Sequence, residues 1–366
     1  MQLKSNWAET RQRFAAWWAG QSTGRPLIHI WAKREKPIGN PFPYEPYAEL
    51  SERYLNTEKM VAHRFELFNH YEPLAETYPE LSLDMGAGSL ALYVGSQPHF
   101  SADSLWFEPI EADYSTPGFL NLDPENHWYK THLAMFKKGQ EMLKGTDTII
   151  CIPDMIEHLD TLASLRGTTD LCFDLYDSPD EVKAACETLN AHYKTCFDAF
   201  NAYCQDETGG NAFSAFSIWG PGRTAKIQCD LAAVLSPDLF REFAVPPLLD
   251  QCRWLDNSLF HLDGPECLCH VPALMEMEEL KALQWTSGHN NPSAGEECWD
   301  DLYRQVKEAG KGVWIALFDY EPDVAIAKAD RLVRKFGAQG FYFLFAPMDR
   351  KDADKLLVKA ERDWKC

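Results

Sequence analysis

The segment GVWIALFDYEPDVAIAKADRLVRKFGAQGFYFLFAP, residues 312–347, contains the repeating unit that decides the fold. Two short runs rich in aromatic and β-branched residues, 312–319 and 340–347, enclose a longer stretch of helical pattern that stops at Gly337. A strand, a helix and a second strand in this order predict two parallel neighbours in one sheet. Gly337 suits the helix end because glycine adopts the backbone conformation required there at little cost.

The same alternation extends over most of the chain. The predicted strands cover residues 26–31, 90–96, 148–154, 213–220, 258–264, 282–288, 312–319 and 340–347. Eight strands with intervening helices predict a (β/α)8 TIM barrel, for which about 250 residues are typical. We therefore expect a single barrel domain over residues 1–366 with an N-terminal helical extension. That helix, from Asn6 to Trp18, should pack outside the barrel, because its large aromatic residues recur on one face.

Composition excludes several classes of function. The chain has 366 residues, 45% of them apolar, and 35 basic against 55 acidic residues give a net charge of −20. Such a charge repels nucleic acid and anionic membrane surfaces, so we expect a small-molecule substrate, no nucleic acid and no membrane. No secretory leader is recognisable at the start of the sequence, and the eleven cysteines are scattered. We therefore expect a cytoplasmic protein whose cysteines are reduced.

The barrel prediction indicates which polar residues are candidates for function, because the chemistry of such barrels lies at the carboxyl ends of the strands. The candidates at or just after predicted strand ends are Asp154, His158, Trp219, Arg223, His261, Asp263, Trp285 and Asp319. We expect these side chains to converge on one pocket. Asp154 and Asp319 have an alternative role as caps of the following helices, and His158 as a surface residue of a loop.

The aromatic and basic candidates also have two interpretations. Trp219 and Trp285 would wall a pocket for an apolar ligand, or they fill layers of the barrel. Arg223 lies in WGPGRT, where neighbouring glycines allow a carboxylate or phosphate to approach closely. It equally suits a pair with a structural acid.

The stretch NSLFHLDGPECLCH, residues 257–270, is the densest group of polar residues at a strand end. His261 and Asp263 are two residues apart, so both side chains should lie on the same face of their strand. They suit either a divalent metal or a histidine that an acid orients for proton transfer. A zinc site that includes Cys267 and Cys269 is conceivable, but their spacing matches none of the strong zinc patterns, and a structural helix start is the simpler interpretation.

Three segments resemble a known family. They are DTLASLRGTTDLCFDLYDSPDEVK (160–183), LSPDLFREFAVPPLLDQCRWL (235–255) and LFHLDG (259–264), and they look like the uroporphyrinogen decarboxylase superfamily. The resemblance implies a TIM barrel of that type. The segments GSLALYVGS, LRGTTDL and HLDGP are most similar to the branch of corrinoid-dependent, trimethylamine corrinoid protein-like methyltransferases.

Departures from the family pattern limit what the resemblance implies. Decarboxylases of the superfamily carry an arginine-rich loop near the N-terminus, where this chain reads WAKREKP. Zinc methyltransferases of the superfamily use a His-x-Cys pair and a further cysteine on the last strand. This chain has His261 and Asp263 instead, and its last predicted strand, GFYFLFAPMD, contains no cysteine. A thiolate zinc centre is therefore not transferable intact.

The resemblance implies an enzyme that moves a methyl group between a corrinoid and a small acceptor or donor. His261, Asp263 and Asp154 would be catalytic, with His261 and Asp263 able to hold zinc. Arg223, Trp219, Trp285, His158 and Asp319 would bind the substrate. The corrinoid would be free or carried by a partner protein, because the chain lacks a DxHxxG cobalamin loop. The alternatives are a decarboxylase of a smaller acid and a non-catalytic partner of a corrinoid protein.

Overall fold

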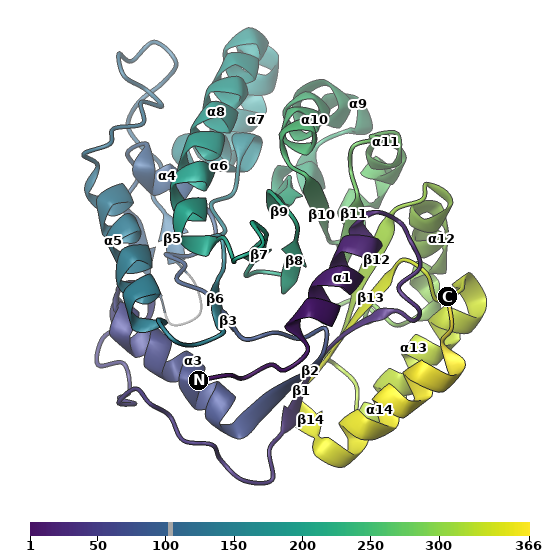
Figure 1. Cartoon of the computed structure of the whole chain (residues 1–366). Helices are drawn as coiled ribbons and strands as arrows, with labels where there is room; N and C mark the ends of the chain where they lie inside the picture. Colours follow the sequence, from purple (N-terminus) through teal and green to yellow (C-terminus); the bar gives the residue numbers. More distant parts are fainter. Residues whose placement is uncertain (102–104) are drawn as a thin grey trace.

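A computed structural model describes residues 1–101 and 105–366 and shows a mixed α/β architecture, with strands in the interior and helices around them (Figure 1). The strands are β1 (Leu27–Lys33), β2 (Tyr71–Ala75), β3 (Glu80–Leu81), β4 (Pro98–Phe100), β5 (Leu105–Phe107), β6 (Ile149–Ile150), β7 (Asn211–Phe213), β8 (Ile218–Gly220), β9 (Thr224–Gln228), β10 (Asn257–Asp263), β11 (Ala282–Thr286), β12 (Gly312–Leu317), β13 (Phe341–Phe345) and β14 (Met348–Asp349).

The α-helices are α1 (Trp7–Trp18), α2 (Glu52–Leu55), α3 (Thr57–His70), α4 (Leu90–Tyr93), α5 (His127–Met142), α6 (His158–Arg166), α7 (Thr168–Asp177), α8 (Pro179–Cys204), α9 (Pro237–Leu239), α10 (Val245–Trp254), α11 (Val271–Met275), α12 (Asp300–Glu308), α13 (Pro322–Phe336) and α14 (Arg350–Asp363). Short 3-10 helices are η1 (Asp230–Val234), η3 (Pro265–His270) and η4 (Glu297–Trp299), and η2 (Phe240–Ala244) is a π-helix.

The central sheet has the strand order β14-β1-β13-β12-β11-β10-β9, with β2 antiparallel to β1. All neighbours along that path are parallel. Helices connect successive strands from β9 to β13, which places the carboxyl ends of these strands at one edge. The sequence therefore predicted the part of this parallel core formed by β1 and β10 to β13, but not β9 or β14.

The remaining inner strands pair separately. β3 and β6 form a parallel pair, and β7 joins them through a single bridge between Ile152 and Phe213. Two buried polar side chains connect this group to the central sheet. The hydroxyl of Thr77 bonds both the N–H and the C=O of Ile30, and the amide of Asn211 bonds both backbone groups of Thr224. Within the described residues, the backbone ladders do not close into a ring, so barrel closure is not shown.

Six predicted strands overlap β1, β6, β10, β11, β12 and β13. The prediction for 90–96 is wrong: residues 90–93 form α4, and its four side chains are fully buried. A short, entirely apolar run does not distinguish a strand from a buried helix. The prediction for 213–220 is correct only for β8, which it contains, because β8 pairs antiparallel with β7 in a hairpin and is not a strand of the parallel sheet.

The N-terminal helix α1 lies against the amino ends of the inner strands (Figure 1). The indole N–H of Trp17 donates to the carbonyl of Gly340, just before β13, at 2.8 Å. That of Trp18 donates to the carbonyl of Trp219 at 2.8 Å. A Cβ at Gly312 would lie 2.6 Å from the Trp17 ring, so the glycine is what lets the indole approach β12.

None of the helices in the described part of the chain combines the length and the apolar character needed to cross a membrane.

Candidate functional site

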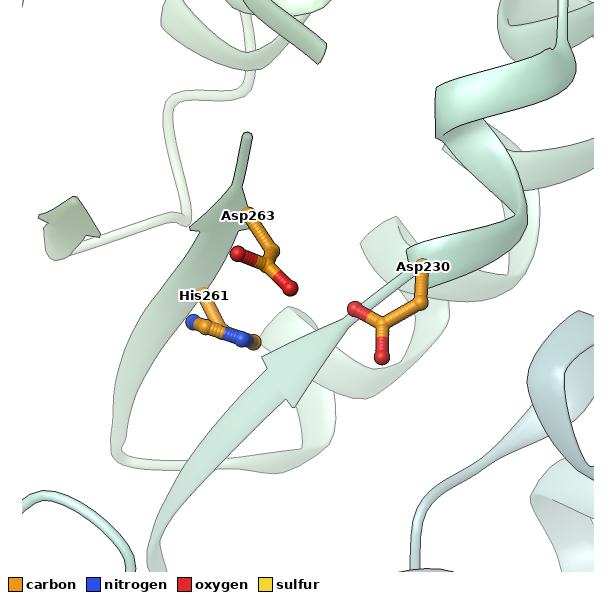
Figure 2. Close-up of side chains that lie close together, drawn as sticks. All are labelled: Asp230, His261 and Asp263. Carbon is orange, nitrogen blue, oxygen red and sulfur yellow. The ribbon is translucent and has the colours of Figure 1, made fainter. Parts of the chain in front are cut away.

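Three side chains capable of binding a metal converge where β9 and β10 end (Figure 2). Asp230, His261 and Asp263 each place one ligand atom within 4.8 Å of the others. His261 and Asp263 lie on the same face of β10, as their two-residue spacing requires. The parallel register pairs His261 with Gln228, so two residues further on Asp230 lies beside Asp263. The sequence analysis did not include Asp230.

Two neighbouring side chains, those of Gln284 and Phe216, fix the orientation of the His261 ring. Its Nδ1 is hydrogen-bonded to Oε1 of Gln284 on the neighbouring strand β11. The ring of Phe216, in the β7–β8 turn, packs against it with a centroid distance of 5.1 Å. Burial and the positive charge of Lys226 lower the pKa of His261, so the imidazole is neutral at neutral pH. Nε2 is then the ring nitrogen that remains for a ligand.

Asp230 is held by the turn that follows β9. Gln228 donates from its side-chain amide to Asp230 at 2.9 Å. Asp160 accepts hydrogen bonds from the backbone N–H of Asp230 at 2.7 Å and of Leu231 at 2.9 Å. Partial loss of hydration, together with the nearby carboxylate of Asp160, raises the pKa of Asp230 to about 7. A divalent cation would relieve this repulsion between carboxylates.

Lys226 supplies a buried positive charge beneath the cluster. Only 1% of this residue is exposed, and Nζ lies 2.7 Å from Asp154 and also donates to the side chain of Gln228. Burial alone would lower the pKa of Lys226, but the carboxylate of Asp154, joined by Glu157 once that group ionises, outweighs burial and keeps the pKa above its ordinary value. Asp154 therefore lies in the same polar network as the cluster, held by an ion pair.

Glu157 and His158 lie deeper than the cluster. The backbone N–H of Gln228 donates to Glu157 at 2.9 Å, and burial raises the pKa of Glu157 to about 8, so it carries a proton at neutral pH. His158 is fully buried, which lowers its pKa to about 4, and neither ring nitrogen has a hydrogen-bond partner among the described residues. The backbone of Ile156 and His158 has positive φ, a strained conformation that often accompanies functional sites.

The structure places three predicted site residues elsewhere. Arg223 precedes β9 instead of following it, at the amino end of the strands, where it pairs with Asp198 at 3.2 Å. Trp219 also lies at that end, where its carbonyl accepts the bond from α1. Trp285 points to the helical layer and packs on Trp299 at 4.9 Å. The expected convergence of these three residues with His261 is therefore wrong.

The other candidates lie near the carboxyl ends but outside the cluster. Asp319 follows β12, is exposed, and accepts a hydrogen bond from Ser293 at 3.0 Å. Cys267 is buried in η3, where burial raises the pKa of its thiol to about 12, and Cys269 is exposed. Neither cysteine belongs to the group of converging ligand atoms.

A further group of polar residues was missed at the end of β3. Asp84 accepts hydrogen bonds from the hydroxyls of Ser82 and Ser214 and from the backbone N–H of Asp154. Ser82 and Ser214 also line a cavity of about 470 Å³, together with side chains from α2, α3 and the segment before them. Arg64 in its wall pairs with Glu80 at 3.1 Å. The cavity therefore adjoins the network that contains Asp154.

Comparison with known proteins identifies a fold. No protein-family model and no curated protein sequence matches the chain. The fold is similar to that of a methyltransferase. This solved structure, a methyltransferase from Methanosarcina mazei, superposes with a TM-score of 0.60 and covers 96% of this chain and 98% of its own, at 15% sequence identity. Identity at this level shows a shared architecture, and the chemistry must be inferred from the site.

Proposed function

We propose that this chain is a metal-dependent enzyme of the methyltransferase type, which moves a methyl group between a corrinoid and a small molecule. The observation that carries the proposal is the convergence of Asp230, His261 and Asp263. The similar fold of a methyltransferase supports the class of reaction. We also propose that the inner strands complete a (β/α)8 barrel of the uroporphyrinogen decarboxylase type, within one domain.

The chemistry of the donor atoms fits a divalent metal. One neutral imidazole nitrogen and two carboxylate oxygens suit zinc, and three protein ligands leave a coordination position open for a substrate. Zinc held there would act as a Lewis acid that polarises the acceptor and lowers its pKa. No thiolate belongs to this set, so the site differs from the thiolate zinc centre of the superfamily's zinc methyltransferases, as the sequence predicted.

The chain's own residues provide the remaining functions. Asp154, oriented by Lys226, is proposed to accept the proton that the acceptor releases. The cavity lined by Ser82 and Ser214 is proposed to admit the small molecule, and the corrinoid would arrive free or on a partner protein. Arg223 has no part in this proposal, because its side chain lies at the opposite end of the strands.

Zinc content and methyl transfer test the proposal. Purified protein should retain about one zinc ion per chain after dialysis, the number expected for one three-ligand site. His261→Ala and Asp263→Asn should lose it and reduce methyl transfer from methylcobalamin by about 100-fold or more. Cys267→Ser should keep both zinc and turnover. Loss of zinc in the cysteine variant, with retention in the His261 and Asp263 variants, would contradict the proposed ligand set.

A further inference from the structure

A chain of two hydrogen bonds leads away from the cluster along β11. Gln284, which is 2% exposed, lies directly opposite His261 in the parallel register. Its Oε1 meets Nδ1 of His261, and its Nε2 donates to the hydroxyl of Thr286 at 2.8 Å. The amide oxygen of Gln284 therefore pairs with the imidazole of His261, and its amide nitrogen pairs with Thr286 on the same strand.

This arrangement fixes which imidazole nitrogen carries the proton. In the structure Nε2 of Gln284 donates to the hydroxyl of Thr286 and Oε1 faces Nδ1 of His261, and an amide oxygen only accepts. Nδ1 must then donate, and in a neutral ring Nε2 keeps its lone pair. Phe216 covers one face of the ring and limits its rotation.

We propose that Gln284 is a positioning residue for metal binding, which holds His261 in the tautomer that offers Nε2 to a divalent cation. This inference rests on the proposed function, because it requires that Asp230, His261 and Asp263 bind a metal. Outer hydrogen bonds of this kind orient the ligand histidine, and their removal weakens metal affinity by about 10- to 100-fold. Thr286 supports the same geometry one step further from the ring.

The test measures zinc affinity by competition with a chromogenic chelator. Gln284→Leu removes the acceptor and should weaken zinc binding by about 10- to 100-fold. Gln284→Glu keeps an oxygen opposite Nδ1 and should bind zinc within about three-fold of the wild type, because a carboxylate is the stronger acceptor. Gln251→Leu is the matched control, since Gln251 is fully buried in α10 and its side chain has no hydrogen-bond partner among the described residues.

The outcomes separate this inference from the proposed function. A wild type that binds no zinc would overturn the proposed function itself. If the wild type binds zinc, equal affinity in Gln284→Leu would overturn the positioning role, and so would a Gln284→Glu variant as weak as Gln284→Leu. If Gln284→Leu does not fold, nitrogen-15 NMR of the histidines in the metal-free wild type tests the positioning role instead. His261 must then be the Nδ1–H tautomer, and the Nε2–H tautomer would refute the inference.

Discussion

Replacement of Lys226 by methionine should destabilise the protein because it isolates the buried carboxylate of Asp154. The Lys226 ammonium lies 2.7 Å from Asp154 and is almost fully buried. Methionine keeps most of the side-chain volume but leaves Asp154 without its counter-ion. The loss of one partner from a buried ion pair costs about 3–5 kcal/mol, since the other charge stays buried and unpaired.

The corresponding change in melting temperature follows from chain length. An unfolding entropy of about 2.1 cal/mol/K per residue gives about 0.77 kcal/mol/K for this chain, so 3–5 kcal/mol corresponds to a decrease of about 4–7 °C. Thermal unfolding followed by circular dichroism at pH 7.5 measures it. The double variant with Asp154→Asn should recover much of the loss, because both charges are then absent. The deficit of the single variant should also shrink on acidification, as protons neutralise the carboxylates.

Lys311 offers a matched control for this experiment. It is also buried, but its Nζ donates to the backbone carbonyls of Met277 at 2.7 Å and Leu280 at 2.9 Å, and not to a carboxylate. Lys311→Met should therefore show a loss of stability that changes little with pH. A Lys226→Met variant as stable as the wild type would refute the reasoning. A double variant no more stable than Lys226→Met would refute it equally.

Three further predictions concern a buried histidine, the cysteines and a close packing contact. Burial lowers the pKa of His132 to about 4, so only the unfolded chain gains this proton between pH 6.5 and 4, and this histidine alone should contribute about 2 kcal/mol to the loss of stability from pH 7 to 5. Denaturant unfolding should therefore show a fall smaller by about that amount in His132→Gln, and equal falls would contradict this. Iodoacetamide at pH 7.5 should alkylate exposed Cys269 and spare buried Cys267, because burial raises the pKa of the Cys267 thiol to about 12. Mass spectrometry measures the modification, and faster alkylation of Cys267 than of Cys269 would show that the Cys267 thiol is accessible. Gly312→Ala should lower stability by about 1–3 kcal/mol, because its Cβ would lie 2.6 Å from the Trp17 ring, and an unchanged melting temperature would exclude that clash.

The sequence predicted the part of the site that lies on a regular strand. His261 and Asp263 follow from alternation along β10, whose apolar residues mark it clearly as buried. Asp230 was missed because β9, TAKIQ, carries Lys226 and Gln228 on its inner side and does not look like a buried strand. Strands that bring polar groups into an interior break the apolar pattern on which strand prediction depends.

Errors in strand phase and boundary explain the misplaced residues. Trp285 and Gln284 are neighbours on β11, so only one of them faces His261, and the apolar indole was assigned there in place of the amide. The indole instead packs on Trp299, which no local pattern reveals. Arg223 was assigned to a carboxyl end because 213–220 was taken for an inner strand. The strand in fact starts one residue after it, which reverses its position.

The side chains of Thr77 and Asn211 take the place of backbone hydrogen-bond partners. The structure should open locally at these two points more easily than within the central sheet. Where the segment 78–210 begins and ends, a side chain takes the place of a backbone ladder to the central sheet: the hydroxyl of Thr77 bonds Ile30, and the amide of Asn211 bonds Thr224. Inside the segment, Asp154 and Glu157 are also bonded to Lys226 and Gln228 of β9. A ladder of backbone bonds opens cooperatively, whereas one side chain releases its partner by rotation about a single bond. Deuterium should therefore enter the amides of Ile30 and Thr224 earlier than those at the centre of β12, because local openings are less costly there than global unfolding. The two ends of this segment would then open locally, while the ion pair between Asp154 and Lys226 keeps its middle attached to β9 beside the metal-binding cluster.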